Sequence, residues 1–177
     1  NFICNEQGLD PISLGSTIAA AMELYSTGAI TQEDTGGVAL EFGDTKAFAA
    51  MVEATARGEG FGKELGQGSL RLCKKYGHPE FSMTIKGEEF PDYDPGAIQG
   101  MGLAYASSNR GGCHLRGYTV SSEVLGLPEK TDALVTEGKA GLVKAFQNLT
   151  AGVDSSDTYI FKTFALSGDD IAQMVDA

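Results

Sequence analysis

The sequence predicts an all-α, multihelical fold made of two packed helical bundles. Apolar residues recur mostly at helical spacing, and the expected helices begin at Asp and end at glycine. Segments in which apolar and polar residues alternate are scarce, which argues against a large sheet. No self-similarity with a period of about 20–50 residues is present, so a solenoid is not expected.

Three helices are expected in the first half of the chain. Asp10 begins the first, with proline at the tolerated first helical position, and Gly28 is placed to end it. Asp44 can cap the second helix, which Gly58 ends. Residues 69–76 form the third. The expected inward stripe of the second helix is Phe48, Met51, Val52 and Thr55.

Residues 81–93 are expected to be extended or looped, because they alternate only weakly and have prolines nearby. This segment is the best candidate for a boundary between the two bundles. We therefore predict one bundle in residues 1–85 and the other in residues 86–177.

Three more helices are expected after this segment. One starts at Asp94, directly before a proline, and continues to about Ser107. The longest is capped by Thr131 or Asp132, and the last begins near Asp169.

Charge and cysteine content exclude several classes of function. Thirteen basic and 24 acidic residues give a net charge of −11 without a basic stripe, so nucleic-acid binding is not expected. The three cysteines form no CxxC pair and no complete disulfide framework, which fits a reducing, cytoplasmic compartment. No apolar run reaches about 18 residues, so no membrane span is expected. The chain starts without Met and stops within a helical pattern, so we expect a piece of a longer protein.

Residues 5–10, NEQGLD, are a first candidate for binding. Gly8 allows a tight turn, and Asn5, Glu6 and Asp10 supply polar groups that could hold a hydrogen-bonding heterocycle. The alternative is a turn that only caps the helix after it, and the residues by themselves favour this alternative.

Residues 100–118, GMGLAYASSNRGGCHLRGY, form the most informative stretch. Gly100 and Gly102 each cost a helix about 1 kcal/mol relative to alanine, which close helix packing or a cofactor would offset. His114 follows a pair of glycines, and a histidine there suits a proton donor or acceptor, although a purely structural histidine is the alternative. Cys113 and His114 are not expected to act as a pair, since adjacent side chains rarely point at each other.

These segments resemble, in the same order, the tungsten-type aldehyde:ferredoxin oxidoreductase family. Residues 3–25, ICNEQGLDPISLGSTIAAAMELY, are similar to its pterin-binding loop, D-x-x-G-L-D. Residues 93–117, YDPGAIQGMGLAYASSNRGGCHLRG, are similar to its segment DPR…GxGLxYATSxRGxxHLR. Residues 149–166, LTAGVDSSDTYIFKTFAL, are similar to its segment DSLGLCKF. The resemblance covers essentially the whole chain, and residues 1–85 and 86–177 would be the helical parts of the family's second and third domains.

The resemblance implies oxidation of aldehydes to carboxylic acids at a tungsten or molybdenum ion held by two pterins. Electrons would pass through a [4Fe–4S] cluster to ferredoxin, and a homodimer is compatible with the family. His114 would lie next to the metal, and Asp154 would begin the second pterin loop. Because the base domain under the cofactor is not matched, this chain alone is expected to bind no cofactor and to be inactive. The residues that would line the first pterin are Asn5, Gly8, Leu9 and Asp10.

The chain departs from the family pattern at four positions. Tyr159 stands where the second pterin loop carries a cluster cysteine, and Asp157 stands where it has glycine. Asn5 replaces a frequent Asp, and Gly96 replaces a usual arginine. A phenol is a poor ligand for iron–sulfur iron, so two alternatives stay open. One is a helical interaction module that has lost redox chemistry, and the other is a relative acting on another carbonyl or acyl substrate.

Overall fold

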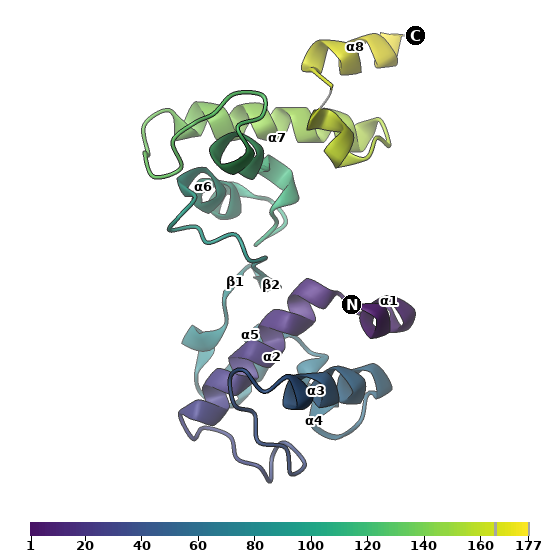
Figure 1. Cartoon of the computed structure of the whole chain (residues 1–177), viewed down its shortest axis with the longest axis vertical. Coiled ribbons are helices and arrows are strands. Elements are labelled where there is room, and N and C mark those ends of the chain that lie inside the picture. The colour runs from purple at the N-terminus through teal and green to yellow at the C-terminus, as the bar shows by residue number, and fades with distance from the viewer. Residues whose placement is uncertain (165, 177) are drawn as a thin grey trace. The chain divides into compact units, whose positions relative to one another are not determined.

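The computed structural model describes residues 1–164 and 166–176, and it confirms the all-α class (Figure 1). Among these residues the only strands are β1 (Thr84–Ile85) and β2 (Glu88–Glu89), a short antiparallel pair. The chain divides into two compact units, Asn1–Pro91 and Asp92–Ala177. The division lies after Pro91 rather than after Ile85, because the hairpin stays with the first unit. The assignment of the halves to the family's second and third domains remains a prediction.

Unit 1 is built around α2 (Pro11–Ser26), which begins and ends as predicted. The Asp10 carboxylate accepts hydrogen bonds from the first turn of α2, and one face of the helix packs on α5 (Figure 1). Fully buried Ile18 and Leu24 belong to the core of the unit. The other helices are α1 (Phe2–Gln7), α3 (Thr45–Arg57), α4 (Gly60–Leu65), α5 (Ser69–Lys75) and the 3-10 turn η1 (Pro79–Phe81).

Two expectations for unit 1 were wrong. The first helix begins before Asp10, since residues 2–7 form α1, and a six-residue helix is too short to show an apolar period. Phe48 is 39% exposed and lies outside the core, and buried Ala47 takes the inward position on α3 beside Met51. The predicted cap Asp44 and the predicted end at Gly58 are confirmed.

Unit 2 packs α6 (Gln99–Ser107) and η2 (Leu115–Gly117) against the long helix α7 (Lys139–Ser155) (Figure 1). α6 ends where predicted but starts late, because the Asp94 carboxylate accepts from the Gly96 N–H at 2.7 Å and turns the chain first. α7 begins after Gly138, whose φ of 76° is left-handed, and not at Thr131 or Asp132. The remaining elements are a π turn, η3 (Ser121–Leu125), then η4 (Ile160–Phe164) and α8 (Gly168–Asp176), which begins where expected.

A buried ion pair joins three segments of unit 2. The side chains of Glu123 and Lys139 are 0% and 6% exposed, and Glu123 Oε1 also accepts from the Gly100 N–H at 3.0 Å. A Cβ added to Gly100 would lie 2.4 Å from Glu123 Oε2, so only glycine fits there. At Gly102 a Cβ would lie 3.1 Å from the Pro95 carbonyl oxygen. Close packing therefore explains both glycines of α6.

In the described part of the chain, no helix is both long enough and apolar enough to cross a membrane.

Candidate functional site

His114 lies between two tyrosines of unit 2. Its ring centroid is 5.7 Å from that of Tyr93 and 6.2 Å from that of Tyr118, and both pairs of rings are tilted. The two tyrosine hydroxyls are hydrogen-bonded to each other at 3.0 Å. Burial, followed by the hydrogen bond with Tyr93, raises the pKa of Tyr118 far above its ordinary value, so Tyr118 stays a neutral phenol. The imidazole is thus half-buried, with aromatic rings on two sides.

Close packing at Gly117 positions the turn that holds His114. A Cβ at Gly117 would lie 3.2 Å from Ala104 Cβ on α6 and 3.4 Å from Gln147 Cγ on α7. The absence of a side chain lets η2 press against both helices. His114 and Arg116, which flank Leu115 on this turn, therefore sit on a tightly packed base.

Arg116 connects this turn to the end of α7. Its Nη1 lies 3.2 Å from Asp154 Oδ2, and its Nε is buried without a hydrogen-bond partner among the described residues. The structure thus brings His114 and Asp154, two predicted site residues, to the same turn of unit 2. The sequence did not predict the Arg116–Asp154 pair, because opposite charges far apart in a chain carry no signal of contact.

Residues 156–159 form a loop between α7 and η4 that carries two notable side chains. Asp157 has φ of 53°, a left-handed conformation that glycine favours. Tyr159 is 62% exposed, and its ring meets the edge of Phe161 with centroids 5.4 Å apart. Phe161 in turn lies 5.9 Å from Tyr118. The rings of Tyr159, Phe161, Tyr118 and His114 therefore form a continuous row.

The predicted residues of unit 1 form the turn between α1 and α2. Gly8 ends α1 with φ of 69°, and the Leu9 N–H donates to the Cys4 carbonyl at 2.8 Å. Asp10 Oδ1 accepts from the Ile12 N–H at 2.7 Å and from the Ser13 N–H at 3.2 Å. The capping role is thus present in the structure. Asn5 is exposed on α1, and a pterin role for these residues stays a prediction.

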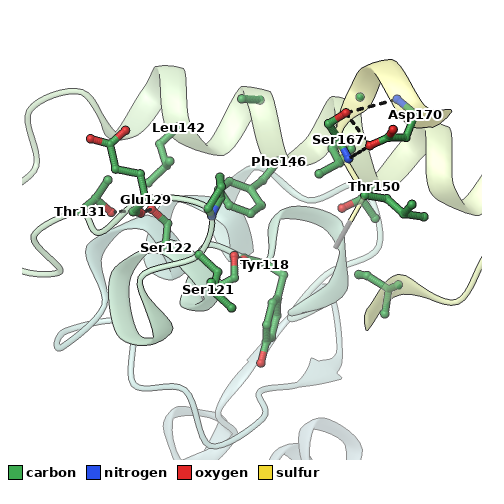
Figure 2. A pocket seen from close by; sticks show the side chains of 17 residues that line it. Tyr118, Ser121, Ser122, Glu129, Thr131, Leu142, Phe146, Thr150, Ser167 and Asp170 are labelled. Atoms are coloured by element: carbon green, nitrogen blue, oxygen red, sulfur yellow. Dashed lines mark hydrogen bonds between the residues drawn. The ribbon is translucent and has the colours of Figure 1, made fainter. Parts of the chain in front are cut away.

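Unit 2 also contains a cavity of about 630 Å³ (Figure 2). Leu142 and Phe146 reach into it from α7, and Tyr118 forms part of its wall. At one end Asp170 Oδ2 accepts from the backbone N–H and the hydroxyl of Ser167, both at 2.7 Å. Sequence patterns did not predict this cavity, because its walls come from three separate segments of the chain.

The cysteines are free and buried. Cys113 Sγ accepts from Arg110 Nη1 at 3.3 Å, and it is not paired with His114. Across residues 1–164 and 166–176, no three His, Cys, Asp or Glu side chains are arranged to hold a metal ion.

Comparison with known proteins decides the family. The family model described as aldehyde ferredoxin oxidoreductase, domains 2 and 3, matches residues 1–177. The chain belongs to the aldehyde ferredoxin oxidoreductase family.

Its relatives in this family include tungsten-containing enzymes. The tungsten-containing aldehyde ferredoxin oxidoreductases of Pyrococcus furiosus and Pyrococcus horikoshii are 46% and 44% identical to it over the whole chain. The chain spans 30% of the length of these two relatives. An aliphatic sulfonate oxidoreductase, WOR-like subunit, from Pyrococcus furiosus is 36% identical over 59% of the chain, which covers 15% of that protein.

The structure accounts for one departure from the family pattern. Asp157 stands where the motif quoted above has glycine, and it keeps the left-handed backbone that glycine would favour. Asp is among the few residues that enter this region readily, so the loop keeps its course. Tyr159, which replaces the cysteine of the motif quoted above, is exposed, and its effect on cluster binding stays a prediction.

Proposed function

We propose that this chain contributes part of the active site of a tungsten or molybdenum pterin oxidoreductase. The parent protein would oxidise an aldehyde to a carboxylic acid, with water supplying the added oxygen and with two protons and two electrons released. The electrons would pass through an iron–sulfur cluster to ferredoxin. The main support is His114, which lies on a tightly packed turn that Arg116 joins to Asp154.

In this proposal His114 binds the oxygen of the aldehyde or manages its proton. A ring N–H can donate to the carbonyl oxygen, and the neutral ring can accept a proton as water adds. Tyr93 and Tyr118 restrict the orientation of the imidazole from two sides. The phenol of Tyr118 stays protonated, so it adds no charge beside the reacting group.

Asp154 is proposed to hold a pterin through hydrogen bonds. A carboxylate accepts several hydrogen bonds, so Asp154 can pair with Arg116 and still accept from ring N–H groups. In unit 1, Asn5, Gly8, Leu9 and Asp10 are proposed to line the other pterin. The capping bonds of Asp10 hold its carboxylate in one orientation, which suits a binding group. The metal, when held by the pterins, supplies the acceptor for the two electrons.

Tyr159 supports the second candidate, a helical interaction module that has lost redox chemistry. Its exposed phenol does not fit as a ligand for an iron–sulfur cluster. A relative with altered cluster ligation and another carbonyl or acyl substrate would also accommodate this residue.

Elemental analysis of the full-length parent separates these candidates. The oxidoreductase requires tungsten or molybdenum in the purified protein, and an intact parent without either metal or pterin would favour the interaction module.

Substitution of His114 tests its role within the oxidoreductase. His114→Phe should lower aldehyde turnover by about 10²–10⁴-fold while the metal content stays unchanged. The control is His78→Phe, the same substitution at the chain's other histidine, which lies in unit 1 and is hydrogen-bonded to Glu80 at 3.0 Å. Turnover that His114→Phe leaves unchanged would remove this residue from the mechanism.

A further inference from the structure

The cavity of unit 2 has the size of a small-molecule site. Its volume of about 630 Å³ lies within the range of roughly 300–1,000 Å³ that such sites have. Its walls come from α7, from residues 118–131 and from a third segment that contributes Ile160 and residues 166–170. Figure 2 shows side chains from all three segments around the same space.

The walls favour an apolar occupant. Leu127, Leu142, Phe146 and Leu149 line the space, and several of the polar lining groups are already hydrogen-bonded within the protein. Ser122 Oγ donates to the Glu129 carbonyl at 2.6 Å. The hydroxyl and the backbone N–H of Ser167 both donate to Asp170. An occupant therefore finds apolar surface and few open hydrogen-bonding groups, a combination that suits a hydrocarbon group.

The charge of the lining opposes anions. Glu129 and Asp170 are the charged side chains among the lining residues of the described chain, and both are acidic. The backbone and hydroxyl bonds from Ser167 lower the pKa of Asp170, so its carboxylate is ionised at neutral pH. A carboxylate, sulfonate or phosphate on the occupant would be repelled at short range.

A single side chain, that of Tyr118, connects the cavity to the candidate catalytic residue. Tyr118 forms part of its wall, and the ring of the same Tyr118 lies 6.2 Å from the ring of His114. A substrate that brings its carbonyl to His114 must place the rest of its carbon skeleton nearby.

We propose that this cavity is a specificity site that binds a neutral hydrocarbon group and discriminates against anionic molecules of the same length. Binding itself needs only this chain, while assigning the hydrocarbon group to the substrate rests on the proposed function. Leu142 and Phe146 determine the fit, and Glu129 contributes to the exclusion of anions.

The test is calorimetric titration of the 177-residue chain with unreactive alcohols from 1-butanol to 1-octanol, and with hexane-1-sulfonate. Affinity should rise roughly three- to fourfold for each added methylene until the cavity is full. Hexane-1-sulfonate should bind at least about tenfold more weakly than 1-hexanol, since an ionised group is costly to place beside two carboxylates. Absence of saturable 1-octanol binding, or equal binding of the sulfonate and the alcohol, would overturn the proposal.

Two matched pairs of variants locate the binding. Ala145→Trp fills the cavity and should weaken alcohol binding at least about tenfold, whereas Ala151→Trp lies on α7 outside the lining and should not. Glu129→Lys should reduce the preference for alcohol over sulfonate, whereas the exposed, non-lining Glu137→Lys should leave it unchanged. Equal effects within either pair would place the binding elsewhere.

The outcome is independent of the redox assignment. Alcohol binding by the chain together with a parent that lacks tungsten and molybdenum would remove the proposed function and keep the site. If the parent oxidises aldehydes but the chain binds no alcohol, the site is removed and the proposed function is kept.

Discussion

Replacing Gly100 by alanine tests the packing of α6 against the buried Glu123–Lys139 pair. The new Cβ would lie 2.4 Å from Glu123 Oε2 and 2.8 Å from Thr119 Oγ1. An ordinary contact needs about 3.4 Å or more, so the carboxylate must move by roughly 1 Å. Such a movement would disturb both the 3.0 Å hydrogen bond from the Gly100 N–H and the ion pair with Lys139.

The expected cost follows from these two effects. Disrupting a buried ion pair costs about 3–5 kcal/mol. Alanine returns about 1 kcal/mol through its better helix propensity. We therefore expect Gly100→Ala to lower the free energy of unfolding by about 2–4 kcal/mol.

Urea denaturation followed by circular dichroism measures this change, and hydrogen exchange resolved by peptide should localise it to unit 2. Gly141→Ala is the matched control, because Gly141 lies in α7 and a Cβ there meets nothing within 4 Å. This control should be neutral or stabilise by up to about 1 kcal/mol. A loss below about 1 kcal/mol for Gly100→Ala would refute the close-packing argument.

Three further outcomes are expected. Asp10→Ala should destabilise α2 by about 1 kcal/mol in urea denaturation, whereas Asp10→Asn, which keeps a capping oxygen, should stay close to wild type. Asp157→Val should cost about 1–2 kcal/mol and Asp157→Gly should not destabilise, since φ at this position is 53°; equal losses would argue against backbone strain. Hydrogen bonds from Ser167 lower the pKa of Asp170 in the folded state below its ordinary value of 3.8. Their contribution to folding stability is therefore present above pH 3.8 and is lost as the pH falls through the lowered pKa. Titration by NMR should therefore find the Asp170 midpoint below 3.8, and Ser167→Ala should raise it; a midpoint that Ser167→Ala leaves unchanged would exclude the hydroxyl as a cause.

Local signals predicted much of the helical framework. Asp10 and Asp44 cap the helices that they were expected to cap, because a short carboxylate before an apolar period satisfies the first free N–H groups. Gly58 ends α3 in the left-handed conformation that a helix terminus favours. The start of α7 was misplaced, because Asp132 has the right chemistry for a cap but lies in a loop whose Ala133 carbonyl accepts from the distant Gln99 N–H at 2.9 Å.

The sequence predicted some residues of the site but not the contacts between them. The motif around His114 pointed to its turn, but the neighbours that define its surroundings, Tyr93 and Tyr118, were not predicted. The link between Arg116 and Asp154 and the cavity beside Phe146 depend on how η2 and α7 pack. Such contacts join residues far apart in the chain, and a single sequence carries no record of them.

The sequence by itself determined the all-α class, the main helix caps and the family resemblance, because these depend on apolar spacing and on residue types at neighbouring positions. Only the tertiary structure showed that close packing requires glycine at position 100, that Arg116 forms an ion pair with Asp154, and that unit 2 contains a cavity. Each of these depends on distances between segments that fold together, and those distances follow from packing and charge burial in three dimensions.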